Sequence, residues 1–170
     1  MREYLATRLM SAGRELPAST RWWPLHSKNL SKFILIREAN QKSSKRVKDD
    51  LFNGAHEWDE FFLSLAPGPM TDHVKLEVDL VEAAIRTDLV KIKETGELLA
   101  RNIDEIAEAA IGKKPEIPGD RLRSLLADHV SGFIESVIRY MDDDEKAFRV
   151  CEKRRGDNTL ALAMLTAEWS

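Results

Sequence analysis

The sequence has little of several features that define whole classes of protein. It contains one cysteine, Cys151, which excludes an internal disulfide framework and a zinc site built on cysteines. It has no apolar run of about 18 residues, so we expect no transmembrane helix and no membrane partner. Its first 17 residues lack the apolar core of a signal peptide, so we expect a cytoplasmic protein. A formal net charge of −3 gives no basic surface, so we expect no nucleic-acid partner.

The rest of the composition is that of an ordinary globular protein. With 170 residues, of which 43% are hydrophobic and 32% charged, the chain can form one domain with a buried core. Apolar residues recur at helical spacing, without useful strand alternation, internal repeats or low-complexity segments. The patterns predict helices at residues 2–13, 24–41, 44–65, 71–111 (bent near 95–96), 120–153 and 159–169. We therefore expect an all-α fold, an up-down four-helix bundle over 20–153 with an arm at 1–19 and a short helix at 154–170 packing on it.

Two His-x-x-x-Glu pairs lie close together in the middle of the chain. His56 is followed by Glu60, His73 is followed by Glu77, and an Ala-Pro-Gly-Pro break at residues 66–69 separates the pairs. Residues four apart share one face of a helix, so each pair can direct an imidazole and a carboxylate to one spot. Two helices joined by a tight break run antiparallel, so the two spots can coincide. Imidazole with carboxylate suits iron, manganese or zinc, and helix bundles hold such sites between inward-facing side chains.

The segment predicted as a helix over 120–153 carries polar residues on its apolar stripe. Asp144 lies between Val137 and Phe148 on that stripe, and burying a carboxylate alone costs several kcal/mol, so it needs a partner. A metal ion, a buried arginine or a water channel would serve equally. His129 precedes Tyr140 by eleven residues on the same stripe, roughly 16 Å along a helix. We therefore expect His129 to be a hydrogen-bonded core histidine rather than a ligand.

Three short segments resemble motifs of the hemerythrin-like, or HHE cation-binding, domain. HEWDEFF at 56–62 is similar to its second-helix motif, DHVKL at 72–76 to the opening of its third helix, and VIRYMDDDEKAF at 137–148 to its fourth-helix motif. A histidine near the start of the first helix, His26, completes the order of motifs, and the similarity covers roughly residues 20–150. Trp22 and Trp23 precede that histidine, and we expect them to pack at one end of the core.

The resemblance implies a metal site with defined roles for individual residues. His26, His56 and His73 would be nitrogen ligands, and Glu60 would bridge two metal ions with Asp144 as its counterpart. Members of the family use such a site, commonly di-iron, for reversible dioxygen binding, for iron or oxygen sensing, or for redox and peroxide chemistry. The resemblance therefore implies iron as the cofactor, with manganese as the other choice.

The chain departs from the family pattern at two positions. Tyr140 stands where the fourth helix normally gives a histidine, and Glu77 stands where many members carry a second histidine on the third helix. More oxygen ligands favour iron(III) or manganese over copper or zinc, and they argue against simple oxygen carriage. The candidate metal ligands are His26, His56, Glu60, His73, Glu77, Tyr140 and Asp144.

Three functions follow as hypotheses. The first is a metal-binding bundle that acts on dioxygen, peroxide or a small-molecule substrate, as a sensor or a non-haem oxidoreductase. The second is a metal-free bundle that binds a protein partner or forms a homo-oligomer through apolar terminal segments at 5–10 and 160–165. The third is a HEPN-type ribonuclease, for which Arg123-x5-His129 fits the Arg-x(4–6)-His pattern loosely.

Overall fold

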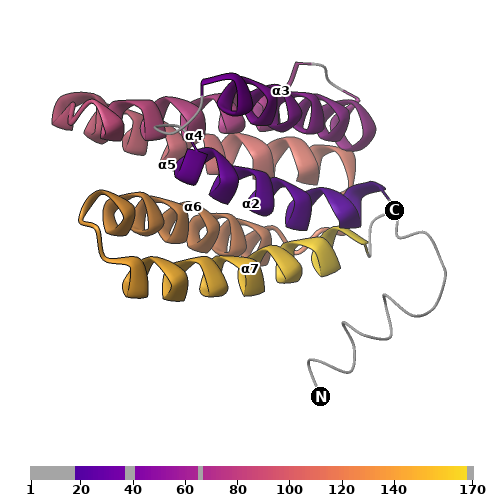
Figure 1. Cartoon of the computed structure of the whole chain (residues 1–170). Coiled ribbons are helices and arrows are strands. Elements are labelled where there is room, and N and C mark those ends of the chain that lie inside the picture. The colour runs from indigo at the N-terminus through magenta and orange to yellow at the C-terminus, as the bar shows by residue number, and fades with distance from the viewer. Residues whose placement is uncertain (1–17, 37–40, 65–66, 168–170) are drawn as a thin grey trace, which may run out of the picture.

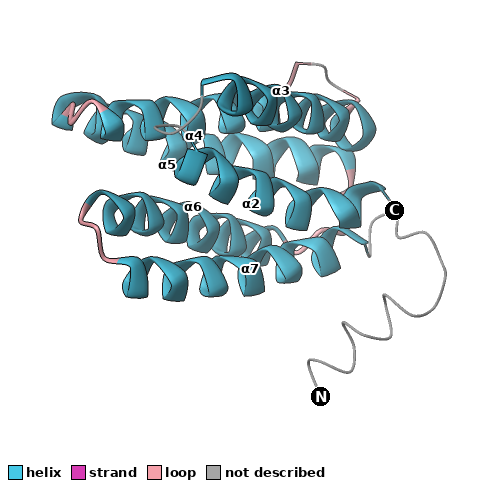
Figure 2. Cartoon of the chain, in the orientation of Figure 1, coloured by secondary structure: helices cyan, strands magenta, loops and turns pink. Residues whose placement is uncertain are grey.

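The described part of the chain consists of helices joined by short turns. The computed structural model describes residues 18–36, 41–64 and 67–167, and no strand occurs within these ranges (Figures 1 and 2). The helix predicted at 2–13 lies outside the described residues. The described residues form six α-helices, namely α2 (Ala18–Ile36), α3 (Gln41–Trp58), α4 (Pro69–Ile85), α5 (Leu89–Lys113), α6 (Gly119–Met141) and α7 (Glu145–Ala167), and a π-helical turn, η1 (Asp59–Leu63), extends α3.

The helices pack side by side in chain order, and the last returns to the first. Each helix contacts the next along the chain, α7 packs against α2, and α4 also meets α6 across the interior (Figure 1). Large side chains from several helices fill the space between them, among them Trp23, Phe33, Leu99 and Phe133. Among the described residues, no helix is both long and apolar enough to cross a membrane.

Two of the predicted long helices are each divided in two. The segment predicted over 71–111 breaks at 86–88 and not near Gly96, which lies inside α5. Thr87 has φ 55° there, and the Asp88 carboxylate caps α5 by accepting from the backbone N–H of Lys91 at 3.0 Å. The helix therefore breaks at a capping side chain, although the spacing of the apolar residues alone predicts one continuous helix.

The helix predicted over 120–153 also ends early. It stops at Met141, residues 142–144 form a turn with Asp143 at φ 54°, and the Asp144 carboxylate caps α7 by accepting from the N–H of Ala147 at 3.0 Å. The predicted turn at 153–158 and the separate helix at 159–169 are wrong, because α7 runs unbroken through both up to Ala167. The all-helical class is confirmed, whereas an up-down arrangement of four helices is not.

The helix predicted over 24–41 spans 18–36 instead. Pro24 lies inside α2, where it removes one hydrogen bond near the helix start. The side chains of Trp22 and Trp23, which immediately precede Pro24, are buried in the core, so the N-terminal extension is held by tertiary contacts. The predicted 44–65 helix becomes α3 and the π-helical turn.

The start of α4 is fixed by a carboxylate from the preceding helix. Asp59, fully buried, accepts hydrogen bonds from the backbone N–H groups of Gly68 (2.9 Å), Met70 (2.9 Å) and Thr71 (2.8 Å), and from the Thr71 hydroxyl (2.6 Å). These are donors that a helix start leaves unpaired. A Cβ at Gly68 would lie 2.8 Å from Asp59 Oδ1, so the contact requires glycine. The same anchor fixes the turn of α4 that carries His73.

Candidate metal centre

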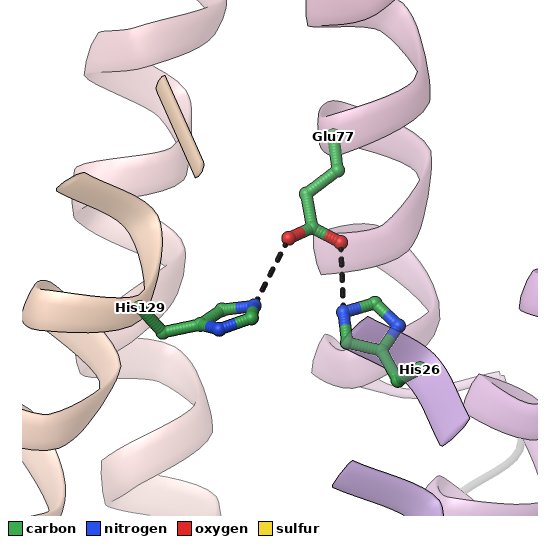
Figure 3. Close-up of side chains that lie close together, drawn as sticks. All are labelled: His26, Glu77 and His129. Carbon is green, nitrogen blue, oxygen red and sulfur yellow. Dashed lines mark hydrogen bonds and ion pairs between the residues drawn. The ribbon is translucent and has the colours of Figure 1, made fainter. Parts of the chain in front are cut away.

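Four ionisable side chains meet in the interior of the bundle. They are His26 from α2, His73 and Glu77 from α4, and His129 from α6, with exposed fractions of 3%, 0%, 0% and 0%. Figure 3 shows His26 and His129 reaching the Glu77 carboxylate from two different helices, one at each oxygen. Charged residues are rarely buried to this extent unless they have partners, so the cluster needs a chemical explanation.

The three imidazoles converge on one carboxylate through their Nε2 atoms. The distances are 3.1 Å from His26 Nε2 to Glu77 Oε2, 3.2 Å from His129 Nε2 to Oε1, and 3.5 Å from His73 Nε2 to Oε1. Ligand atoms of His26, Glu77 and His129 all lie within 4.8 Å of one another. His73 is the outlying member of the cluster, since it does not belong to that group of three.

A second layer of hydrogen bonds fixes the ring of His73. Its Nδ1 lies 2.8 Å from Asn102 Oδ1, and the Asn102 amide nitrogen donates to the Pro69 carbonyl at 2.9 Å. Because the amide nitrogen faces a carbonyl, the amide oxygen must face the ring, and His73 Nδ1 must carry a proton. His73 therefore turns Nε2 towards Glu77, as a metal-bound histidine does when its other nitrogen is held by an acceptor.

Tryptophans form the wall around two of the imidazoles. Trp22 stacks on His26 with ring centroids 4.5 Å apart and 9° between the planes. Trp23 meets His26 and His129 edge to face, at 6.2 Å and 5.7 Å. The expectation that both tryptophans pack into the core is confirmed. They also border the cluster, where their bulk excludes water and strengthens the electrostatic interactions inside.

The electrostatics of the cluster are dominated by burial and by Glu77. Burial alone would raise the pKa of Glu77, but the charges of His26 and His73 and the hydrogen bond from His129 hold it well below its usual range. Burial lowers the pKa of His129 from 6.5 to about 4, against the opposing effect of Glu77. Burial also acts to lower the pKa of His73, but Glu77 and Asn102 outweigh it and the pKa is raised.

The structure brings together three of the seven predicted ligands, His26, His73 and Glu77. His56 and Glu60 have exposed side chains, so the two His-Glu pairs do not meet. The inner face of α3 is formed by Leu51, Ala55 and Trp58, and a residue one position off that face points outward.

The two predicted ligands from the end of the fourth helix also lie away from the buried cluster. Asp144 is exposed and does not face the core, because the break before α7 uses its carboxylate as a helix cap. Tyr140 is half-buried against Phe148, with ring centroids 5.9 Å apart. The helix that was expected to align both with the core ends between them.

His129 is the cluster member that the sequence reasoning assigned to the ordinary core. Its distance from Tyr140 argues against a ligand role only if Tyr140 belongs to the site. The usable signal was its place on the apolar stripe of α6 between Leu126 and Phe133, which are both buried. Its complete burial also removes support from the ribonuclease hypothesis, since this imidazole has no surface with which to meet an RNA.

Comparison with known proteins adds no assignment: no family model, no curated protein and no solved structure matches this chain. The relation to hemerythrin-like domains therefore stays a prediction.

The atoms of the cluster fit a metal ion chemically. Three buried atoms form no well-aligned hydrogen bond among the described residues: His73 Nε2, His26 Nε2 and Glu77 Oε2. Both imidazole nitrogens nevertheless lie within ion-pair distance of the Glu77 carboxylate. Buried polar atoms normally have partners, and a set of imidazole nitrogens with one carboxylate is a common ligand set for iron and zinc.

Proposed function

We propose that this protein binds one divalent transition-metal ion in the bundle interior, with His26, Glu77 and His129 as ligands and His73 as the fourth. The observation that carries the proposal is the convergence of three Nε2 atoms within 3.5 Å of one fully buried carboxylate. A metal ion would coordinate the Nε2 atoms that now face Glu77. It would also satisfy the atoms that lack hydrogen bonds.

The ligand set supports one ion rather than two. A dinuclear carboxylate site is built from several carboxylates on neighbouring helices, and this cluster contains only Glu77. In residues 18–36, 41–64 and 67–167, the His26–Glu77–His129 group is the one set of three or more His, Cys, Asp or Glu side chains close enough to share an ion. Iron suits both the imidazoles and the carboxylate, with zinc and manganese as competitors.

The surroundings suit chemistry on a small neutral molecule such as dioxygen or peroxide. A bound iron ion would supply the redox or Lewis-acid function. The chain itself provides a dry setting through Trp22 and Trp23, orients His73 through Asn102, and keeps His129 uncharged and ready to bind at neutral pH. We therefore propose dioxygen or peroxide sensing or redox chemistry as the function of the loaded protein.

Elemental analysis tests metal binding with a matched pair of histidine variants. The protein is purified from medium supplemented with iron, manganese and zinc and is then freed of loosely bound ions. We expect about one ion per chain in the wild type and in the exposed-site control His56→Gln. We expect less than a tenth of that in the buried-site variant His129→Gln. Equal metal content in the two variants, or none in the wild type, would overturn the proposal.

Binding to a partner protein is a second candidate, favoured by two exposed apolar side chains. Leu89 and Val90 open α5 and are 72% and 69% exposed. The C-terminal segment named in the sequence analysis gives less support, because Leu162 and Leu165 are buried in the chain's own core. A homo-oligomer in sedimentation velocity that Leu89→Asp converts to a monomer would support this candidate. A monomeric wild-type protein would exclude the simplest partner for this surface, a second copy of the chain.

A further inference from the structure

Three tryptophans lie together beside the buried cluster. Trp22 and Trp23 come from α2, and Trp58 comes from the end of α3. The ring centroids of Trp22 and Trp23 are 4.8 Å apart, and the Trp58 centroid lies 6.2 Å and 6.3 Å from them. At these separations each indole contacts the other two. Tryptophan is one of the side chains that lose a single electron most readily, so this group can supply an electron next to the candidate metal centre.

Trp22 stacks directly on a proposed metal ligand. Its ring lies almost parallel to the His26 imidazole, with 4.5 Å between the centroids. Because His26 Nε2 is the atom that faces Glu77, one imidazole ring would separate Trp22 from an ion held there. Gly54 of α3 leaves room for this arrangement, since a Cβ at that position would lie 2.8 Å from Trp22 Nε1. The indole is thus held against the ligand by the close approach of two helices.

Trp22 is also the member of the group that is most exposed to solvent. Its exposed fraction is 7%, against 0% for Trp23 and 4% for Trp58. Trp23 is enclosed, and its Nε1 has no hydrogen-bond partner among the residues that the structure describes. An oxidised indole becomes neutral either by giving its N–H proton to an acceptor or by taking up an electron. Trp23 lacks such an acceptor, whereas an electron from a reductant in solution can enter the group at Trp22.

A single iron ion leaves the reduction of peroxide one electron short. Conversion of hydrogen peroxide to two water molecules consumes two electrons and two protons, and iron(II) supplies one electron when it becomes iron(III). The proposed site holds one ion, since the cluster contains one carboxylate. A soluble reductant cannot touch the ligands, because the four side chains of the cluster are at most 3% exposed. A side chain in contact with a ligand is therefore the nearest source of the second electron.

We propose that Trp22 donates the second electron when iron(II) in the buried cluster reduces hydrogen peroxide. This inference rests on the proposed function, because it requires iron in the cluster. The oxygen–oxygen bond breaks, iron(II) and Trp22 each lose one electron, two protons are taken up from solvent, and two water molecules form. Iron(III) and a Trp22 radical cation remain on the protein. Two molecules of a one-electron reductant such as ascorbate then restore the indole and iron(II).

Electron paramagnetic resonance of freeze-quenched samples detects the radical directly. Protein loaded with iron(II) is mixed with an equimolar amount of hydrogen peroxide, and the iron content of every sample is measured. We expect an organic radical whose hyperfine splitting narrows when the tryptophans carry deuterated indole rings. Trp22→Phe should lose most of this signal at unchanged iron content, whereas the control Tyr140→Phe, which removes an oxidisable ring packed on Phe148, should keep it. Zinc-loaded wild type should give no radical, because zinc has no redox chemistry.

Peptide mass spectrometry of the wild type tests the same step without relying on a variant that folds. After repeated additions of peroxide to the iron-loaded protein, we expect oxygen-bearing tryptophan at Trp22 rather than at Trp23 or Trp58, and ascorbate should suppress it. Iron-loaded protein without a tryptophan radical, an unchanged signal in Trp22→Phe, or oxidation spread equally over the three tryptophans would overturn the inference. A wild type that holds no iron would overturn the proposed function as well, and the measured iron content separates the two failures.

Discussion

Acidification of the metal-free protein should reveal His129 through the pH dependence of stability. Its pKa is lowered from 6.5 to about 4 in the folded state, so between these values the unfolded chain binds one more proton than the folded chain. Stability is therefore fully present above about pH 6.5 and is lost as the pH falls towards 4. At about 1.4 kcal/mol per pKa unit, the loss attributable to His129 amounts to about 3 kcal/mol.

The neighbouring ionisable groups act outside the most useful part of this window. The raised pKa of His73 contributes stability below its usual pKa that is lost as the pH rises through the folded value, on the alkaline side. The lowered pKa of Glu77 contributes stability that is lost only as the pH falls below its usual value of 4.5. Between pH 6.5 and 4.5, His129 is thus the member of the three that controls the slope.

Urea unfolding followed by circular dichroism, in the presence of a chelator at a series of pH values, measures this slope. We expect the free energy of unfolding of the wild type to fall by about 2 kcal/mol more than that of His129→Gln between pH 7 and 4.5, with the rest of the loss below pH 4.5. The exposed-site control His56→Gln should keep the wild-type slope. If the free energy of unfolding depends on pH equally in the wild type and in His129→Gln, the argument that His129 is a buried, neutral imidazole is refuted.

Further predictions concern the residues that support the cluster. Asn102→Leu should weaken metal binding about 10- to 100-fold in competition with a chelator, because the His73 ring loses its orienting acceptor; unchanged affinity would contradict this. Calorimetry in two buffers of different ionisation enthalpy should show a proton released from His73 when metal binds near neutral pH, and equal heats would contradict this. Asp59→Ala should lower the free energy of unfolding by about 3 kcal/mol in urea, because the start of α4 loses its side-chain acceptor; a loss below about 1 kcal/mol would contradict that role. Cobalt(II) should quench tryptophan fluorescence, and Trp22→Phe should lose most of the quenching because Trp22 stacks on the ligand His26.

The helical class of this chain could be predicted from sequence, but the helix ends that determine the site could not. The apolar residues keep the same helical spacing on both sides of Asp88 and Asp144, so this spacing predicts a continuous helix across each break. What ended the helices was a single capping carboxylate in each case, assisted by a positive φ at the preceding residue. A short aspartate cap is a weak signal when it competes with a long apolar period.

The sequence predicted the residues of the candidate site only where it assigned the buried face of a helix correctly. His73 and Glu77 lie on the apolar stripe of α4, and the structure buries both. His56 carries the same spacing to its glutamate, but the register of α3 turns it outward. His129 lies on the apolar stripe of α6, but its contact with Glu77 depends on the packing of α6 against α4, which no local motif encodes.

X-ray absorption spectroscopy of the metal-loaded protein tests the central claim most directly, because it counts and identifies the ligands of the bound ion. We predict three imidazoles, contributed by His26, His73 and His129, together with one carboxylate oxygen, and no second metal within about 4 Å. The Glu77→Gln protein should fail to hold the ion. A metal–metal vector, a shell with fewer than two imidazoles, or no retained metal would contradict a single ion bound at the buried cluster.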